Sequence, residues 1–279
     1  MIHIKYILLN IKMKFPKISI ITVVKDGMPY LQSCIKSFDL QKYRNKEHII
    51  IFSKSKDTTY SFLMKNKKKN RFIFYDKVSK NKWGAINLGL KLAKGDIIGL
   101  LHSDDVFYQN NTLKLVKKKF SGNVNCIYGD ILFSKKDNLK TIKRVWVSKN
   151  FIKENIKFGW TPPHVAIFLK KKLAKKILYK KKYEISSDYD FIIRLFNNKK
   201  VLPSYIRNYI QIMRLGGQST SVKNYLKKFN EDLMIAKKYF KYYYFCVLLK
   251  ILRKILQIRI ITNKINSLYL NDLNRSIKL

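Results

Sequence analysis

The chain has 279 residues, 47% of them hydrophobic, which suits one large α/β domain with or without a small helical appendage. Its 59 basic residues against 17 acidic ones give a net charge of +42, which favours anionic membranes, phosphorylated substrates or nucleic acids as partners. No apolar run approaches the roughly 20 residues of a spanning helix. Lysines are scattered along the whole chain rather than gathered in one stripe, which argues against a specific nucleic-acid partner.

Residues 1–15 read as an N-terminal extension without the small-residue cleavage site of a signal peptide. Because the organised pattern begins only at Pro16, we expect Met13 as an alternative start to the first methionine. The three cysteines lie far apart among apolar residues, without metal-ligand spacing: Cys34, Cys126 and Cys246. We expect them to be reduced and buried in a cytosolic protein.

The first half of the chain alternates β-branched apolar runs with amphipathic helical patterns. The expected strands are 18–24, 47–52, 71–75 and 96–101, and the expected helices are 30–38, 60–67 and 83–94. This alternation predicts an α/β fold with a parallel, doubly wound sheet and right-handed crossovers.

The second half is less regular and predicts a small antiparallel portion. Its expected helices are 111–120, a basic helix 171–178 and one opening at 186–190; its expected strands are the pair 125–133 and 142–147, then 165–169, 201–205 and 209–213. From residue 222 the pattern is helical. We therefore divide the chain into the extension 1–15, a main domain 16–222 and a C-terminal basic amphipathic helical segment 223–279.

A single long helix is expected over 239–261, and its longest charge-free run, 242–249, is too short to span a bilayer. Such a helix suits the membrane interface, where tyrosines favour the headgroup level. The alternative is a terminal helix that packs on the core or in a dimer interface. The large apolar surface and the basic flanks favour membrane association.

Two adjacent carboxylates, Asp104 and Asp105, directly follow the buried run 97–101. Open α/β sheets bind ligands at the carboxyl ends of their strands. Neighbouring carboxylates repel each other unless a cation or a hydrogen-bond network holds them, and a hard divalent cation is the simplest partner. The alternative is a polar turn before the next helix, with Asp105 or Asn111 as its cap.

This ordered series of strand, acidic turn, strand pair and Ser-Asp-Tyr-Asp helix resembles glycosyltransferase family 2 over residues 17–223. The nearest subgroup is the colanic-acid and polysaccharide-biosynthesis transferases. The resemblance implies a GT-A fold and an inverting enzyme that uses a nucleotide-diphosphate sugar. A Rossmann dinucleotide enzyme is not expected, because no Gly-x-Gly-x-x-Gly follows the first strand.

The stretch His102-Ser103-Asp104-Asp105 matches the family's Asn-Ser-Asp-Asp or Asp-x-Asp-Asp turn. By this resemblance Asp104, with Asp105 beside it, binds a divalent cation, Mn²⁺ or Mg²⁺. His102 stands in the first position of the turn. Its imidazole either ligates the cation, hydrogen-bonds a metal-bound water, or is an ordinary strand-end histidine.

The element Ser187-Asp188-Tyr189-Asp190 matches the family's Glu-Asp element and implies that Asp188 is the general base. Asp190 is instead expected to pair with Arg194 one helical turn later.

The resemblance places the nucleotide near the end of the first strand, at Thr22 and Val24. Further nucleotide-binding positions are implied in the loop 53–59 and in the segment 76–90: Ser53, Ser55, Asp57 and Asn87. Both segments depart from the family pattern. Ser53, Lys77, Ser79 and Gly84 stand where acids are usual, and Trp83 replaces a tyrosine. These changes indicate a different nucleotide contact, a different donor or a weakened enzyme.

Two further loops match the acceptor side and cover of the family's active site. Pro162-Pro163-His164 matches Pro-x-His, and Gly216-Gly217-Gln218-Ser219 matches a Gly-Gly-x-Ser loop. Arg214 beside the second loop either touches the diphosphate or is solvated.

The first hypothesis is thus an inverting, metal-dependent transferase of a sugar from a UDP- or GDP-sugar. Its acceptor would be lipid-linked or a polysaccharide, at the inner face of the cytoplasmic membrane. The alternatives are a catalytically weakened GT-A module that binds or scaffolds, and a basic nucleic-acid-binding protein motivated only by the net charge.

Overall fold

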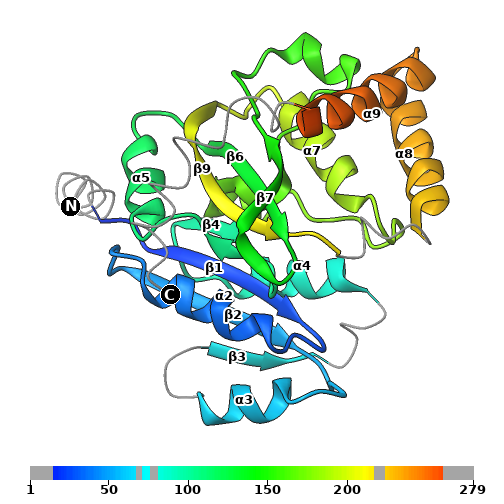
Figure 1. Ribbon diagram of the computed structural model, residues 1–279. Coiled ribbons are helices and arrows are strands. Elements are labelled where there is room, and N and C mark those ends of the chain that lie inside the picture. Colours follow the sequence, from blue (N-terminus) through cyan, green and yellow to red (C-terminus); the bar gives the residue numbers. More distant parts are fainter. Residues whose placement is uncertain (1–14, 67–70, 76–80, 217–223, 260–279) are drawn as a thin grey trace, which may run out of the picture.

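The computed structural model describes residues 15–66, 71–75, 81–216 and 224–259. Within these ranges a curved, nine-stranded sheet forms the centre of the molecule, and helices cover both of its faces (Figure 1). The strand order is β3-β2-β1-β4-β8-β6-β9-β5, with β7 paired to β6 outside this path.

Four parallel strands form the first half of the sheet: β1 (Ile18–Val24), β2 (Lys46–Phe52), β3 (Arg71–Phe74) and β4 (Ile97–Leu100). The helices between them are α2 (Tyr30–Asp39), α3 (Thr59–Lys65) and α4 (Lys82–Leu92). Each strand was expected from its apolar run, and the parallel order follows from the intervening helices.

The second half of the sheet is mixed. Its strands are β5 (Val106–Phe107), β6 (Cys126–Lys135), β7 (Asn138–Trp146), β8 (Ile167–Lys170) and β9 (Pro203–Arg214). β8 runs antiparallel to both β4 and β6, β7 forms a hairpin with β6, and β9 is parallel to β6. The expected α/β fold, with a mostly parallel sheet and an antiparallel portion, is confirmed.

The remaining helices are α5 (Thr112–Lys119), α6 (Lys171–Ala174), α7 (Ser187–Asn197), α8 (Tyr225–Tyr239) and α9 (Tyr243–Arg259), with short 3₁₀ turns η1 (Lys153–Phe158) and η2 (His164–Ala166). The predicted basic helix 171–178 is shorter than expected. The continuous helix predicted over 239–261 is interrupted, because α8 ends at Tyr239 and Phe240 has extended backbone angles. The half-buried Phe240 packs against the core. Helix α9 runs in a different direction from α8 (Figure 1).

Two short strands were predicted at 201–205 and 209–213, but the structure has one continuous strand, β9. Register shifts in its pairing with β6 occur on both sides of Asp130. These irregularities accommodate the extra residues between the two predicted strands. The pairing of β9 with β6 therefore continues on both sides of the irregularities.

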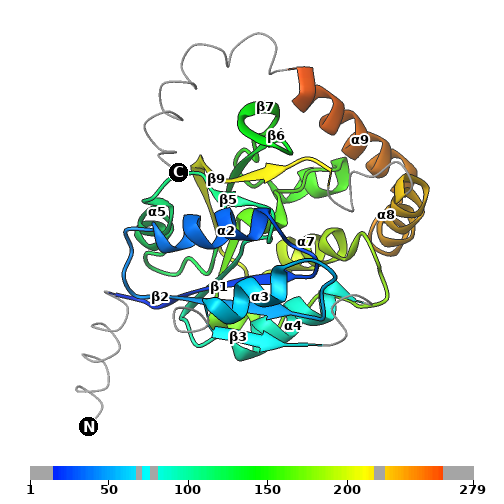
Figure 2. The same cartoon turned by 60° about the horizontal axis from the view of Figure 1, so that its bottom comes forward.

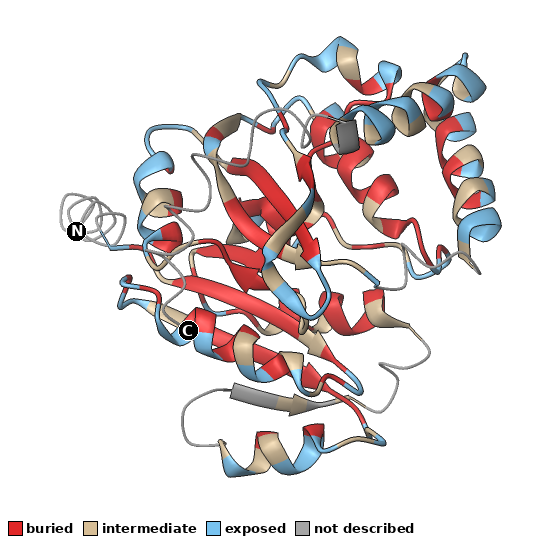
Figure 3. Cartoon of the chain, viewed as in Figure 1, coloured by how far each residue is buried: buried red, intermediate tan, exposed pale blue. Residues whose placement is uncertain are grey.

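Alternate residues of the central strands contribute to two hydrophobic cores, one on each face of the sheet. Ile21 and its neighbours pack with α4 and α7 on one face, whereas Ile20 packs with α2 and α5 on the other. Buried residues accordingly concentrate along the sheet and on the inner sides of the helices (Figure 3). All three cysteines are free and buried, as expected.

Helices α8 and α9 lie together beside α7 (Figure 2). They contribute Ile235, Ala236 and Val247 to the same core that α4 and α7 share. The described part of the chain contains no helix that is both long and apolar enough to cross a membrane. The boundary between a main domain, 16–222, and a separate C-terminal segment, 223–279, stays a prediction.

Candidate active site

The acidic turn after β4 lies at the carboxyl end of the parallel strands and is tied to its neighbours. Leu101 donates a backbone hydrogen bond to Ile21 (3.0 Å), and Asp105 donates one to His102 within the turn (3.1 Å). Asp105 is 1% exposed. Its Oδ1 accepts from the backbone N–H of Arg214 (3.1 Å), while its buried Oδ2 has no hydrogen-bond partner among the described residues.

Arg214 clamps this turn from the end of β9. Its Nη1 donates to the carbonyl of Asp104 (2.7 Å) and its Nε to the carbonyl of Lys136 (3.0 Å). The guanidinium lies 4.9 Å from the ring centroid of Tyr30. Arg214 is therefore engaged in holding the turn rather than fully solvated.

The two carboxylates suit a divalent cation electrostatically, but they supply only part of the ligands that such a cation needs. Burial raises the pKa of both groups, and the charge of Asp104 raises that of Asp105 further. A cation would relieve this repulsion and use the unpaired Oδ2 of Asp105. The described residues bring no three acidic, histidine or cysteine side chains together as a metal cage. A cation here would share one or two carboxylates with phosphate oxygens and water, which is how Mg²⁺ commonly binds.

A carboxylate–histidine pair faces the turn from the other half of the sheet. His164 Nδ1 lies 3.4 Å from Asp188 Oδ2, and Asp188 Oδ1 accepts from the backbone N–H of Tyr189 (2.9 Å). Burial raises the pKa of Asp188, but the hydrogen bond and charge of His164, with the charges of Lys228 and Lys250, outweigh it and lower the pKa. Asp188 is therefore ionised at neutral pH.

The same histidine connects Asp188 to the acidic turn. Its ring lies edge-on to His102, with 5.3 Å between the centroids. The buried Nε2 of His164 has no hydrogen-bond partner among the residues described. Burial and the neighbouring His164 lower the pKa of His102 to about 3, so His102 is neutral. The structure thus brings together His102, His164 and Asp188 from three separate segments.

Helix α8 holds the segment that leads into α7 and so positions Asp188. The carboxylate of Glu231 accepts from the backbone N–H groups of Glu184, Ile185 and Ser186 at 2.9, 2.9 and 2.7 Å. Three backbone donors just before a helix are thereby satisfied by one buried acid. This local anchoring is not visible in the sequence, because Glu231 lies 45 residues from Ser186.

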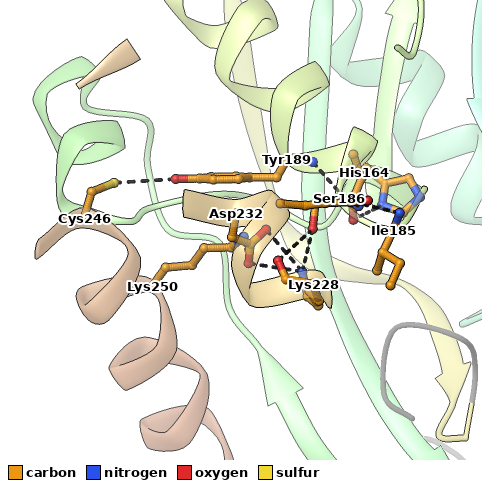
Figure 4. Close-up of polar contacts among 10 residues, drawn as sticks. His164, Ile185, Ser186, Tyr189, Lys228, Asp232, Cys246 and Lys250 are labelled. Atoms are coloured by element: carbon orange, nitrogen blue, oxygen red, sulfur yellow. Dashed lines mark hydrogen bonds and ion pairs between the residues drawn. The ribbon is translucent and has the colours of Figure 1, made fainter. Parts of the chain in front are cut away.

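Helix α9 adds a second anchor through a buried ion network (Figure 4). Lys228 and Lys250 lie 3.3 and 2.8 Å from the carboxylate of Asp232. Lys250 also lies 3.5 Å from the ring centroid of Tyr189, next to Asp188. Burial lowers the pKa of Lys250 to about 8. The electrostatic environment of Asp188 therefore depends on both C-terminal helices.

Lys82 is a site residue that the sequence analysis missed. It begins α4, and its Nζ lies 4.5 Å from the ring centroid of Trp83. Burial lowers its pKa, while the charges of Asp188 and Asp104 raise it. Lys82 thus lies within electrostatic reach of both candidate functional carboxylates. The sequence could have indicated Lys82, because it lies at the start of a predicted helix within the segment 76–90 that resembles the family.

Two predicted nucleotide-binding residues, Ser55 and Asp57, tie the loop after β2 to the loop after β1. Ser55 Oγ accepts from Asp26 N–H (3.1 Å), and Asp57 Oδ2 accepts from Met28 N–H (2.8 Å). Burial raises the pKa of Asp57, but hydrogen bonds from Thr59 and Met28 outweigh this and lower it. These side chains shape the loops at the carboxyl ends of both strands.

The other predicted nucleotide-binding residues are buried. Thr22 Oγ1 donates to the carbonyl of Leu101 (2.7 Å) and lies 2.8 Å from His48 Nε2, inside the fold. Val24 and Ser53 are 1% and 2% exposed, and the hydroxyl of Ser53 has no hydrogen-bond partner within the described chain.

Asn87 binds the backbone of Tyr179 with both of its amide atoms.

Gly216 has a positive φ of 103°, which favours glycine. Gly217 lies outside the described residues. The predicted pairing of Asp190 with Arg194 is confirmed at 2.6 Å.

Known proteins resemble this chain in sequence and in fold. The sequence model of the family described as Glycosyl transferase family 2 matches residues 19–181. A PGL/p-HBAD biosynthesis glycosyltransferase of Mycobacterium bovis is 26% identical over 229 residues, covering 77% of this chain and 85% of the relative.

Solved structures show the same fold. TarS of S. aureus in complex with UDP-GlcNAc aligns with a TM-score of 0.61 at 16% identity, over 89% of this chain and 75% of TarS. In the complex of TarS with UDP the match covers 80% of this chain and 65% of TarS. The mannosyltransferase PcManGT from Pyrobaculum calidifontis, in complex with GDP-Man and Mn²⁺, aligns with a TM-score of 0.58 at 11% identity, over 93% and 79% of the two chains. The expected GT-A fold is confirmed.

Proposed function

Because this chain belongs to glycosyltransferase family 2, we propose that it transfers a sugar, with inversion, from a nucleotide-diphosphate sugar to an acceptor hydroxyl. The observation that carries the proposal is the ionised Asp188, paired with His164, which faces the acidic turn across the neutral His102. UDP- or GDP-sugars are the donors that we favour, since the similar structures contain UDP-GlcNAc and GDP-Man.

In this reaction Asp188 would accept the proton of the acceptor hydroxyl as that oxygen attacks the anomeric carbon. General-base assistance of this kind is worth roughly 10²–10⁴-fold in rate. His164 would orient Asp188 and keep it ionised, because its hydrogen bond and charge lower the pKa of that carboxyl. A single displacement needs no covalent glycosyl-enzyme, and inversion is its stereochemical result.

Asp104 and Asp105 would hold a divalent cation, Mn²⁺ or Mg²⁺. Such an ion supplies positive charge against the leaving nucleoside diphosphate. The unpaired Oδ2 of Asp105 and the raised pKa of both carboxyls support this assignment. PcManGT, which has the same fold, was solved with Mn²⁺. Lys82 and Arg214 would add positive charge on either side of the turn.

The acceptor in this proposal is lipid-linked or a polysaccharide, as in the colanic-acid-like subgroup that the sequence resembles. The protein would act as a peripheral enzyme on the inner face of the cytoplasmic membrane. The support is helix α9, whose exposed side chains include Phe245, Leu248, Leu252 and Leu256. An exposed apolar face on a basic helix suits an anionic membrane surface.

The direct test is calorimetric titration of UDP and GDP, with and without Mn²⁺, into the wild type and Asp104→Asn. We expect cation-dependent binding of one nucleotide that is lost in Asp104→Asn. Glu154→Gln, which removes an exposed carboxylate on η1, is the matched control and should bind as the wild type does. No binding of either nucleotide to the wild type would refute the proposed donors.

A catalytically weakened module is the second candidate, and one observation favours it. Side chains at several predicted nucleotide positions are occupied by contacts within the protein, including Asn87 and Asp57. Donor hydrolysis separates the two candidates. An active transferase should hydrolyse its nucleotide sugar slowly in the presence of Mn²⁺, whereas a weakened module should hydrolyse none.

A further inference from the structure

The tip of the β6–β7 hairpin contacts helix α2, which lies far from it in the sequence. The hydroxyl of Tyr30, the first residue of α2, donates a hydrogen bond to Oδ1 of Asp137 at the tip (2.7 Å). The ammonium of Lys136 lies 5.6 Å from the centroid of the same ring. Figure 1 shows the hairpin running down the front of the sheet toward β1. Residues 107 positions apart thus fix the tip beside the start of α2.

Arg214, at the end of β9, joins this tip to the acidic turn. Its Nε donates to the carbonyl of Lys136 (3.0 Å), and its Nη1 donates to that of Asp104 (2.7 Å). Its Nη2 donates to Ser33 Oγ on α2 (3.3 Å). The guanidinium also lies 4.9 Å from the ring centroid of Tyr30. The three guanidinium nitrogens therefore bind three different segments, which are the tip, the turn and α2.

These contacts bridge the segments that follow two neighbouring strands. β1 and β4 pair in parallel, α2 follows β1, and the acidic turn follows β4. The hydrogen bond to Asp137 raises the pKa of Tyr30, with smaller contributions from burial and from the charge of Asp104, so Tyr30 is within electrostatic reach of the turn. Open α/β sheets bind their ligands outside the carboxyl ends of such strands. The tip thus lies at the edge of the sheet where the proposed donor would bind.

The hairpin tip, residues 135–138, is exposed and is held in place by few contacts within the hairpin. Register shifts interrupt the pairing of β6 with β7 on both sides of Ser134, directly before the tip. A hydrogen bond between exposed groups competes with water and contributes little net free energy. The contacts of Tyr30 and Arg214 therefore decide where the tip lies, and the bond between Tyr30 and Asp137 can break and form again with a small change in free energy.

We propose that Tyr30 and Asp137 form a latch that holds the hairpin tip across the donor site while a nucleotide is bound. The latch would hold Arg214, and through it the acidic turn at Asp104, in the arrangement that retains the nucleotide diphosphate, and it would open for release. This inference rests on the proposed function, since a donor nucleotide is what the latch retains. Tyr30 and Asp137 are positioning residues, because they act on the turn through Arg214.

The test is a double-mutant cycle with Tyr30→Phe, Asp137→Ala and the double variant. Tyr30→Phe removes the hydroxyl donor and keeps the ring beside Arg214, whereas Asp137→Ala removes the acceptor. Stopped-flow measurement of the dissociation rates of UDP and GDP, each with Mn²⁺, is the readout. The matched control is Tyr242→Phe/Glu154→Ala, which makes the same chemical changes at exposed positions of other segments.

We expect Tyr30→Phe to release the nucleotide about fivefold faster than the wild type, which is the size of effect expected for one hydrogen bond. Asp137→Ala should also release it faster, although by a smaller factor, because loss of a negative charge by itself favours an anionic ligand. The double variant should release it no faster than Tyr30→Phe, since both changes remove the same bond. The control should match the wild type.

Unchanged release from Tyr30→Phe would overturn the inference, and so would effects of the two single changes that multiply in the double variant. In either case the nucleotide still binds the wild type, so the proposed function stands and the latch alone fails. If neither UDP nor GDP binds the wild type with Mn²⁺, the proposed donors fail and the latch is refuted with them.

Discussion

Asn87 on α4 binds Tyr179 through both ends of its side-chain amide. Its Nδ2 donates to the carbonyl of Tyr179 (2.8 Å), and its Oδ1 accepts from the N–H of the same residue (2.9 Å). The ring of Tyr179 stacks on Trp83, and His164 lies 6.2 Å from it, between ring centroids. Asn87 therefore anchors the segment that supports His164, and its predicted contact with the nucleotide stays a prediction.

We therefore expect Asn87→Ala to lower the free energy of unfolding by about 1–3 kcal/mol, because two buried backbone groups lose their partner. Urea unfolding at neutral pH measures this. The affinity for UDP with Mn²⁺ should change little in the folded variant. A large loss of nucleotide affinity with unchanged stability would instead support the predicted nucleotide contact.

Asp188→Asn should reduce turnover by roughly 10²–10⁴-fold, because the amide cannot accept the proton of the acceptor hydroxyl. The affinity for the donor nucleotide should stay near that of the wild type, since Asp188 lies across His164 and His102 from the acidic turn. Single-turnover kinetics and calorimetry separate these effects. Equal losses in turnover and nucleotide affinity would contradict a role for Asp188 as the base.

His164→Phe should move the acid limb of the pH–rate profile to higher pH. The hydrogen bond and charge of His164 lower the pKa of Asp188, so their removal raises that pKa, and a higher pH is then needed to ionise the base. The profile of turnover against pH measures the shift. An unchanged acid limb with reduced turnover would mean that His164 only supports the local packing.

His48 should make the fold sensitive to mild acid. It is 2% exposed, and burial, with a smaller effect of Lys46, lowers its pKa to about 3, well below the value of about 6.5 expected in the unfolded chain. A depressed folded pKa means that the stability is fully present above about pH 6.5 and is lost as pH falls, because the unfolded state binds the proton first.

The loss from His48 alone should reach about 2 kcal/mol at pH 5.0 relative to pH 7.5, by the linkage between pKa and stability. His48→Gln keeps a polar partner for Thr22 and removes the titration. Urea unfolding at pH 7.5 and 5.0 should therefore show a smaller loss in the variant. His102 is present in both proteins and cancels in the comparison. Equal losses would assign the acid sensitivity to other groups.

The apolar face of α9 should bind anionic membranes. Leu248→Gln/Leu252→Gln replaces two side chains that are 52% and 44% exposed, so the fold should tolerate the change. Sedimentation with phosphatidylglycerol vesicles should show binding reduced by about tenfold or more, in line with the lost transfer of two leucines into an apolar phase.

The matched control for that experiment is Leu226→Gln/Met234→Gln on α8, where the side chains are 75% and 63% exposed. It should bind vesicles like the wild type. An equal loss in both variants would mean that general surface hydrophobicity, rather than the face of α9, controls binding.

The pattern of apolar runs predicted the strands of the first half and their parallel order, because buried parallel strands and the helices between them are local features of the sequence. The second half was predicted less well. The pattern predicts two strands where the structure has one, β9, because its continuity depends on bulged pairing with β6 that no local pattern encodes. The break between α8 and α9 likewise follows from the packing of Phe240 on the core.

The sequence by itself determined the α/β class of the fold and the family of the chain. It also determined the acidic turn at Asp104 and Asp105 and the candidate base Asp188. These are properties of short contiguous segments. Only the tertiary structure decided that His164 and Asp188 form a pair, that Lys82 lies near both carboxylates, and that Asn87 binds the backbone of Tyr179. Such contacts join side chains far apart along the chain. The physical reason is that burial and long-range packing, which no local pattern encodes, set the partners and the charge of each group.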